Sequence, residues 1–425
     1  MTLDTHAPAR GCPYRLDATG ADTHGEAAAL RALGPAVRTI LPGGVEAWSV
    51  TDPGLIRRLL THRGVSKDAS RHWPAYIRGE IPEDWPSRIF VDVRNALTAY
   101  GPEHRRLRRP LAAAFTPRRV RALIPQIEAI TRSLLDDLGG TAPGDVVDLR
   151  QRLTWRLPLM VVNAVFGTPD HLGDQFREAA GALFATDISP EQAQTANARM
   201  YALIDELIAY KAAHPAGDLS TDLIKAQAAG EITGQELRDS FVLIISAGHE
   251  TTVNALNHAI INLSTHPDQL ALALHGAVPW EQVVEEVLRY EPPVATLIMR
   301  FAVHDIYDEP SGVHFRQGDA IAINYAAAGR DPHRHGDTAD LFDITRTDTT
   351  HLSFGHGPHL CVGAELARVE ARIALQRLFE RYPGLRLAIH PTRLQPLPSN
   401  ISNGHTHLPV VLFTDDGRQG PSPTR

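Results

Sequence analysis

The stretch FGHGPHLCVG (residues 354–363) places one cysteine between two glycine-rich turns and the start of a helix-like run. The chain has 425 residues, and Cys12 and Cys361 are its only cysteines. Two cysteines are too few for a disulfide framework, or for a zinc or iron–sulfur site built from four cysteines. A metal ion held by Cys361 therefore needs most of its ligand atoms from another source.

The residues after Cys361 predict a helix over 363–381. Apolar residues follow at steps of four, three and four, as on one buried helix face: Val362, Leu366, Val369 and Ile373. A thiol at a helix N-terminus meets free N–H groups and the positive end of the helix dipole, which lower its pKa and favour thiolate. Gly355, Gly357 and Gly363 remove side chains, so that a bulky flat partner can approach the backbone closely.

The spacing of Phe354, Gly357, Cys361 and Gly363 matches Phe-x-x-Gly-x-x-x-Cys-x-Gly. This pattern resembles the haem-binding loop of the cytochrome P450 family. The resemblance implies haem b as cofactor, with Phe354, Cys361 and Gly363 in its binding loop and the Cys361 thiolate as the axial iron ligand. In that family the thiolate favours O–O cleavage. The alternative is a small buried cysteine at a helix start.

Other metal sites have weaker support in the sequence. The segment HETTV (249–253) begins like the zinc-protease motif H-E-x-x-H but has Val253 where the second histidine must stand. His356, His359 and Cys361 offer zinc ligands, yet no matching Cys or His pair lies at standard finger spacing. The chain also lacks the CxxCH needed for c-type haem attachment.

A second motif interrupts the apolar helix FVLIISAGHETTVNAL (241–256) with polar residues. An acid and a hydroxyl buried in a helix are costly unless they are used or paired, and the alternative is a helix edge that faces solvent. The segment resembles the central P450 helix that runs over the haem. The resemblance implies that Ala247 and Gly248 make room for dioxygen, that Thr251 hydrogen-bonds the bound oxygen, and that Glu250 relays protons.

The segment EEVLRYEPP (285–293) places Glu286 and Arg289 on one helix face. A lone Glu-x-x-Arg is commonly a surface ion pair. Followed by two prolines and placed ahead of the cysteine, it resembles the structural ExxR helix behind the haem. The family usually has an arginine just before the phenylalanine of the following meander, whereas this chain has Leu341 there. We expect Arg346 or another cation to take its place, or a simpler network.

Haem carries two propionates, so cations should converge on it. The segment GPEHRRLRR supplies His104 and Arg108 at i,i+4, and Arg300 and His359 match the other two propionate contacts of the P450 family. Three further arginines of this segment are expected to be solvated charges, or a basic surface on which an acidic electron donor docks: Arg105, Arg106 and Arg109.

The pattern along the chain predicts a mainly α fold with a small β part. We expect a hairpin over 36–52, a helix after it, a long ordered loop over 72–93, mostly helix over 103–265, helices at 280–290 and 363–381, and strands within 312–325 and 407–413. The P450 resemblance places haem between the central helix and the cysteine-loop helix. We expect one haem-thiolate domain over 1–413 and a disordered tail over 414–425.

Composition limits the partners. The chain is 43% hydrophobic and carries a net charge of −7, which is typical of a soluble globular protein and does not indicate a nucleic-acid partner. The N-terminus lacks a signal-peptide pattern, and no stretch approaches the length of a membrane helix. We therefore expect a cytoplasmic protein with no membrane or nucleic-acid partner.

The resemblance implies a haem-thiolate monooxygenase that hydroxylates an apolar steroid, terpenoid or macrolide-like molecule. No built-in flavin or nicotinamide domain is evident, so electrons are expected from a separate ferredoxin and ferredoxin reductase. One alternative is oxidative coupling of aromatic rings in an aromatic peptide or cyclic dipeptide. Another is a non-catalytic haem sensor or carrier, against which Glu250 and Thr251 argue, because a sensor needs no proton delivery.

Overall fold

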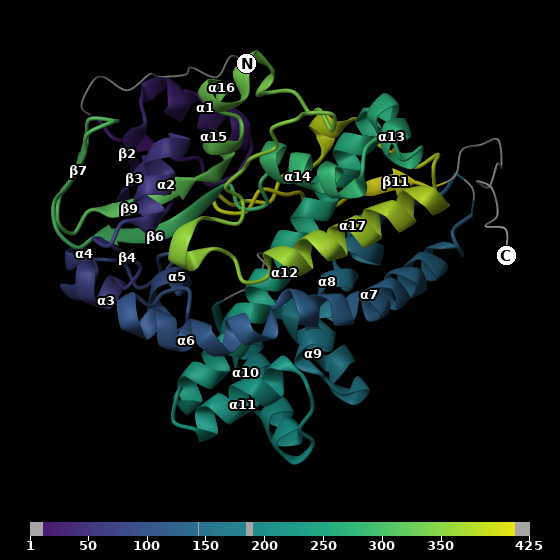
Figure 1. The fold of residues 1–425 in the computed structure, drawn as a ribbon, viewed down its shortest axis with the longest axis horizontal. Coiled ribbons are helices and arrows are strands. Elements are labelled where there is room, and N and C mark those ends of the chain that lie inside the picture. Colours follow the sequence, from purple (N-terminus) through teal and green to yellow (C-terminus); the bar gives the residue numbers. More distant parts are fainter. Residues whose placement is uncertain (1–11, 143, 184–189, 413–425) are drawn as a thin grey trace.

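The computed structural model describes residues 12–142, 144–183 and 190–412. The predicted disordered tail, residues 414–425, lies outside the described residues. The expected fold class is confirmed, because helices dominate and strands form a small part (Figure 1).

The longer helices build most of the molecule, and they follow the predicted order. Their bounds are α1 Thr23–Leu33, α2 Pro53–Thr61, α6 Gly101–Ala114, α7 Pro117–Leu138, α8 Arg156–Phe166, α9 Asp170–Leu183, α10 Pro190–Ala213, α11 Leu219–Ala228, α12 Gly234–Thr265, α13 Pro267–Leu274, α14 Trp280–Tyr290 and α17 Ala364–Arg381. Short helices connect them: α3 Ala69–His72, α4 Pro74–Ile77, α5 Ile89–Asp92, α15 Tyr325–Gly329, α16 Pro332–His335, η1 Arg150–Thr154, η2 Gly336–Thr338, η3 Gly357–His359 and η4 Pro391–Arg393.

The strands form three sheets. The largest has six strands in the order β1-β2-β3-β9-β6-β4, with bounds Tyr14–Arg15, Ala36–Ile40, Glu46–Val50, Ala320–Asn324, Thr296–Ala302 and Val65–Ser66. The second has the order β10-β11-β5, with bounds Arg386–Leu387, Pro409–Val411 and Val146–Asp148. The third pairs β7 Ile306–Asp308 with β8 Val313–Phe315. Figure 1 shows the N-terminal strands β2 and β3 beside β9 and β6 from much later in the chain.

Helix α12 is the longest element and passes through the middle of the molecule, where α17 crosses it (Figure 1). Its start is a capping box, in which the Thr233 hydroxyl accepts from the Glu236 N–H and the Glu236 carboxylate accepts from the Thr233 N–H. It ends at Thr265, as predicted, because Pro267 begins the next helix. The helix thus carries the predicted proton-relay motif at its centre.

One local prediction is wrong, and one strand was missed. The segment 72–93 is partly helical, because Pro74 starts the short helix α4 and residues Ile89–Asp92 form α5. The strand β6, Thr296–Ala302, was not predicted, although its run of apolar residues is typical of a strand buried on both faces. The strands predicted within 312–325 are confirmed as β8 and β9, which belong to different sheets.

None of the helices in the described parts of the chain combines the length and the apolar content that crossing a bilayer requires.

Candidate active site

The cysteine loop is held by short backbone contacts. The Cys361 N–H donates to the Phe354 carbonyl at 2.9 Å, and Gly363 caps α17, so the thiol lies just before the helix. Gly357 has φ +72°, and a side chain there would stand 2.7 Å from the Leu60 carbonyl oxygen of α2. The expected reason for this glycine is therefore wrong, since it makes room for α2 and not for a flat partner. At Gly363 the nearest atom to such a side chain is the Cys361 Sγ, at 3.9 Å, which leaves that side open.

Cys361 faces a hollow inside the protein. Its side chain is accessible, yet burial raises the pKa of its thiol. Both observations are explained if the side chain borders an internal space that protein surrounds. On α12, Ala247 is also accessible, although Ile245 and His249, two residues before and after it, are buried. Thr251, one helical turn after Ala247, is half-buried.

The predicted thiol activation is wrong for the protein alone. Burial is the largest influence on the Cys361 thiol and raises its pKa. The Gly363 backbone hydrogen bond and the charges of Arg108 and Arg368 lower it by less. Desolvation therefore outweighs the helix terminus, and a thiolate here needs a further positive charge such as a metal ion.

Basic side chains gather beside the cysteine loop. The rings of His104 on α6 and His359 in the loop lie 3.9 Å apart between centroids, and Arg108 donates to the Leu360 carbonyl. Burial lowers the pKa of His359 strongly, and the charges that lower it further include Arg300. All four predicted propionate contacts therefore lie in one cluster.

Lys67 is a fifth member of this cluster, and sequence reasoning missed it. Burial and the charge of Arg300 lower its pKa well below the usual value, and only 3% of the side chain is exposed. The strand pairing explains the position, since Ser66 on β4 lies opposite Phe301 on β6 and the next residue therefore comes beside Arg300. Linear spacing gives no sign of this contact, because it depends on the pairing of strands far apart in the chain.

The basic side chains of this cluster have no carboxylate partner among the described residues. We name Lys67, His104, Arg108, Arg300 and His359 the cation cluster, and within the described residues none of them forms an ion pair with a carboxylate. Buried polar atoms without a hydrogen-bond partner include Lys67 Nζ, His104 Nε2 and Arg300 Nη1. Buried charges are normally paired, so the cluster fits a ligand that brings at least two negative charges.

The donor set fits haem better than a protein-bound metal ion. In the described residues, no three His, Cys, Asp or Glu side chains are grouped so that they could hold a metal ion. The cation cluster would hold the two haem propionates, and Cys361 offers one thiol to the iron, whose other ligands a porphyrin provides.

The neighbouring arginines of α6 have other partners than expected. Arg106 donates to Glu236 at 2.7 and 2.9 Å, at the start of α12. Arg109 lies 2.6 Å from Glu231. Arg105 is exposed and has neither of these partners. The expected solvated or donor-docking surface therefore loses two of its three charges, because Arg106 and Arg109 connect α6 to α12 and to the loop before it.

The motif on α12 is arranged as follows. The Thr251 hydroxyl donates to the Ala247 carbonyl at 2.7 Å, within the helix. Burial raises the pKa of Glu250, while a hydrogen bond from the Ser402 hydroxyl and the charge of Arg150 lower it. A side chain at Gly248 would stand 3.2 Å from Val162 of α8, so this glycine faces a helix contact and its expected role in making room for dioxygen has no support.

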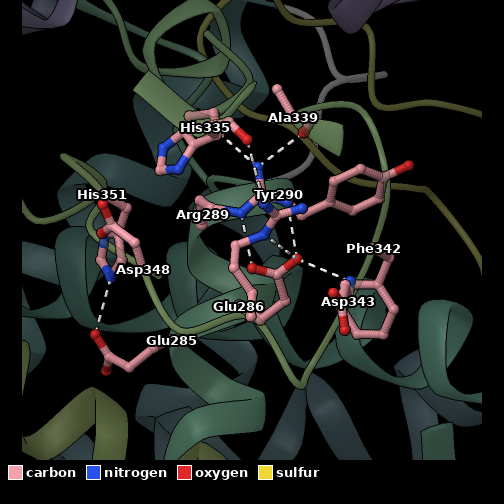
Figure 2. A network of polar contacts seen from close by, with 12 residues as sticks. Glu285, Glu286, Arg289, Tyr290, His335, Ala339, Phe342, Asp343, Asp348 and His351 are labelled. Carbon is pink, nitrogen blue, oxygen red and sulfur yellow. Dashed lines mark hydrogen bonds and ion pairs between the residues drawn. The ribbon is translucent and has the colours of Figure 1, made fainter. Parts of the chain in front are cut away.

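The Glu286–Arg289 pair lies in the interior, with both side chains 0% exposed. Arg289 donates to the two Glu286 carboxylate oxygens at 2.7 and 2.8 Å, as Figure 2 shows. Its remaining donors reach the carbonyls of Gly329, Ala339 and Leu341 at 2.8 to 2.9 Å. This network joins α14 to the segment that leads to the cysteine loop.

Two features complete this network. Arg346 Nε lies 3.5 Å from Glu286 Oε1, at the place where the family pattern expects a second cation. The Asp343 N–H also donates to Glu286 at 2.9 Å (Figure 2). A side chain at Gly329 would stand 2.2 Å from the Arg289 carbonyl oxygen, so only glycine fits this contact.

Phe354 packs in the cysteine loop under Arg368, whose guanidinium lies 4.5 Å from the ring centroid. Arg368 also pairs with Glu285 at 2.5 Å, and His351 approaches the same carboxylate at 3.1 Å (Figure 2). Although burial opposes the charged form, these hydrogen bonds lower the pKa of Glu285 to about 2. The loop is thus tied to α14 and α17.

Comparison with known proteins gives a family match. The family model described as "Cytochrome P450" matches residues 280–392, which hold the Glu286–Arg289 pair and Cys361. A relative from Streptomyces carzinostaticus, 2-hydroxy-5-methyl-1-naphthoate 7-hydroxylase, is 40% identical over 94% of this chain and 98% of its own length.

Solved structures agree. CYP154A1 from Streptomyces coelicolor A3(2) is 48% identical, with a TM-score of 0.86, over 94% of this chain and all of the other. Testosterone-bound CYP154C4 from Streptomyces sp. ATCC 11861 is 39% identical, with a TM-score of 0.89, over 95% and 99% of the two chains.

Proposed function

The chain belongs to the cytochrome P450 family and is a monooxygenase, and from that premise we propose that it binds haem b through the Cys361 thiolate and hydroxylates an apolar small molecule. The substrate class we propose is steroid, terpenoid or macrolide-like. The comparisons support this class, because relatives include 6-deoxyerythronolide B hydroxylase and a testosterone-bound enzyme. Because the chain is a monooxygenase, the alternative of a non-catalytic haem sensor or carrier is excluded.

One observation carries the proposal: an accessible thiol inside the protein lies beside a cluster of basic side chains that lacks a carboxylate partner. Burial raises the pKa of the thiol and lowers the pKa of Lys67, so the protein alone disfavours the charged form of each group and leaves Lys67 Nζ without a partner. A dianionic iron porphyrin offsets both, because its propionates pair with the cations and its metal stabilises the thiolate. Bound haem would supply dioxygen binding and activation, with the thiolate favouring O–O cleavage.

The residues of α12 would move protons. Hydroxylation with O2 takes up two electrons and two protons for each hydroxylated product and releases one water. Glu250 would supply the protons, and the Thr251 hydroxyl, which both donates and accepts hydrogen bonds, would pass them on. The other face of α12 packs in the core, which limits direct access of bulk water.

The electrons would come from a ferredoxin and its reductase, since P450 enzymes of this type use redox partners. Coupling of aromatic rings remains a second proposed outcome, because the same haem site serves it and the described residues do not separate the two. We propose that the segments 294–297 and 400–401 line the substrate pocket. They adjoin, since the Ala295 N–H donates to the Ile401 carbonyl at 2.7 Å.

The test is an absorbance titration of the purified, haem-loaded ferric protein against a steroid and macrolide panel and an aromatic cyclic-dipeptide panel. We expect a saturable shift toward high spin with a member of the first panel. A shift with the second panel alone would favour ring coupling. Absence of a haem band in protein supplied with haem would overturn the cofactor assignment.

Two substitutions test the residue roles. Cys361→Ser should abolish the thiolate-ligated spectrum, and retention of the wild-type spectrum would contradict ligation by this residue. Thr251→Ala should lower the product formed per NADPH by about tenfold or more and raise peroxide release, because proton delivery contributes factors of that size to the rate. Unchanged yield of product per NADPH would contradict its role.

A further inference from the structure

The proposed pocket wall at residues 400–401 lies in a long loop. Between η4, which ends at Arg393, and β11, which begins at Pro409, the chain runs through turns and isolated bridges, one of which joins Val294 to Ser402. Loops of this kind are more mobile than the helices and strands that they connect. The position of the wall therefore depends on contacts from outside the loop.

Asn403, two residues after the wall, is held at three points. Its side-chain amide donates to the Glu291 carboxylate at 2.9 Å, and its N–H donates to the Pro293 carbonyl at 2.9 Å. Its own carbonyl lies 3.2 Å from His258 Nε2 on α12 and can only accept, so this ring nitrogen donates. Asn403 and His258 are 7% and 5% exposed, which shields these bonds from water.

Glu291 is a firm acceptor for the Asn403 amide. It directly follows α14, and only 12% of its side chain is exposed. Arg330 donates to one carboxylate oxygen at 2.6 Å, and His24 Nε2 lies 2.7 Å from the oxygen that Asn403 reaches. Burial alone would raise the pKa of this carboxyl, but His24, His258 and Arg330 lower it well below the usual value. A carboxylate that stays charged accepts a stronger hydrogen bond than a neutral group.

The next residue brings the loop onto α12. A side chain at Gly404 would stand 2.2 Å from Asn254 Oδ1, so only glycine lets the loop lie this close. The contacts of Asn403 and Gly404 therefore meet the same helix, one turn apart, at His258 and Asn254.

These anchors set the place of both parts of the proposed wall. Pro293, which accepts from Asn403, directly precedes the segment 294–297, and the Ala295 N–H donates to the Ile401 carbonyl at 2.7 Å. On the other side, α12 carries Ala247, which is accessible beside the hollow that Cys361 faces. The Asn403 contacts thus fix the wall relative to the helix that borders the hollow.

We propose that Asn403 is a positioning residue for the substrate, which acts through the wall at 400–401, and that Glu291 and His258 hold Asn403 in place. This inference rests on the proposed pocket and adds what fixes its width. Without the anchor the wall adopts several positions, and only a fraction of the molecules has the one that fits a ligand. The apparent affinity then falls by that fraction.

The alternative is that Asn403 only stabilises the fold. In that case its loss lowers the free energy of unfolding and leaves the pocket unchanged in the molecules that remain folded. Gln269 offers a matched control, because it is also an amide that anchors a loop, through bonds of 2.8 and 2.9 Å to Phe342 and Ile344. That loop leads toward the cysteine and contains none of the proposed wall.

The experiment compares imidazole with 4-phenylimidazole in absorbance titrations of the ferric, haem-loaded protein. Both ligands bind an accessible haem iron through a ring nitrogen, so the ratio of their dissociation constants reports contact of the phenyl group with the pocket. We expect wild type to prefer 4-phenylimidazole by at least about tenfold, because the phenyl group is buried. Asn403→Leu should lose about fivefold of this preference. Gln269→Met should keep it, although both variants lower the midpoint of urea denaturation.

The outcomes separate this proposal from the one it rests on. An unchanged preference in Asn403→Leu would overturn it, whatever happens to stability. If Asn403→Leu does not fold, His258→Phe tests the same anchor from α12, because it keeps a ring and removes the donor to the Asn403 carbonyl. An unchanged preference there would also overturn the proposal. Failure of wild type to bind imidazole at iron would instead refute the proposed haem site.

Discussion

Two buried polar regions of the molecule differ in one respect. The Glu286–Arg289 pair is complete, because every donor of the Arg289 guanidinium meets a carboxylate or a carbonyl, and only the neighbouring Arg346 Nε has no hydrogen bond. The cation cluster is incomplete, because Lys67, His104 and Arg300 each leave a buried atom without a partner. The three cluster members that lack a partner are almost as shielded from solvent as this pair, with 3 to 4% exposure against 0%, so burial alone does not explain the difference.

The difference separates structural charge from binding charge. A buried ion pair that satisfies all its hydrogen bonds holds two segments together and needs nothing else. A buried set of like charges without partners costs free energy until an anion enters. The first region therefore belongs to the fold and the second to the proposed cofactor.

The largest effect is expected from breaking the complete network. Arg289→Met removes both guanidinium hydrogen bonds of Glu286, whose carboxylate is 0% exposed and keeps only the Asp343 N–H and the more distant Arg346, which costs about 3 to 5 kcal/mol. We expect loss of the folded protein whether or not haem is supplied, measured by urea denaturation and limited proteolysis. The control is Arg372→Met, whose partner Glu281 is 70% exposed, with a change below about 1 kcal/mol. Wild-type stability of haem-free Arg289→Met would contradict the structural role of the Glu286–Arg289 pair.

A smaller effect of mixed sign is expected from the cation cluster. Lys67→Met should stabilise the haem-free protein by about 1 kcal/mol, because it removes a buried amino group that has no hydrogen-bond partner. The same change should weaken haem binding by about tenfold, because a propionate partner is lost. Urea denaturation of the haem-free protein and haem transfer to apomyoglobin measure the two effects.

The matched control for Lys67 is an α6 arginine outside the cluster. Arg109→Met removes a 65% exposed charge paired with Glu231, and should change neither haem transfer nor stability by more than about 1 kcal/mol. If haem-free Lys67→Met is less stable than wild type and its rate of haem transfer is unchanged, Lys67 stabilises the fold and does not bind the cofactor.

The smallest effect is a pH dependence. Burial, and then the charge of Arg108, lower the pKa of His104 to about 4. In the unfolded chain this histidine binds a proton near pH 6.5, whereas in the folded, haem-free protein it binds one only near pH 4. The free energy of unfolding therefore falls as the pH drops from about 6.5 to about 4. We expect a loss on the order of 1 kcal/mol in this window, obtained as the difference between wild type and His104→Gln in urea titrations. Haem should shrink this difference, because a propionate favours the imidazolium.

The sequence was informative wherever a local pattern decides the structure. The amphipathic run after Cys361 and the proline after Thr265 each depend on neighbouring residues, and both helices match the prediction. The four propionate contacts followed from family motifs, and the fold brings them together. Their roles stay predictions.

What the sequence did not reveal depends on contacts between distant segments. Lys67 joins the cluster only because β4 pairs with β6, and Gly357 is required because the loop meets α2. The thiol pKa was predicted in the wrong direction, because local spacing reports the helix terminus but not the depth of burial, which dominates. Arg106 was expected in solvent for the same reason, since Glu236 is 130 residues away.

The sheet order has a consequence for synthesis of the chain. The hairpin β2–β3 is made early, yet its neighbour β9 begins at Ala320 and the thiol follows at Cys361. Until the ribosome has passed these residues, β3 exposes an unpaired edge, which invites pairing with other chains. The proposed haem ligation would therefore come late in translation, and a nascent chain stalled before Cys361 is a candidate for chaperone binding or degradation rather than a partly loaded enzyme.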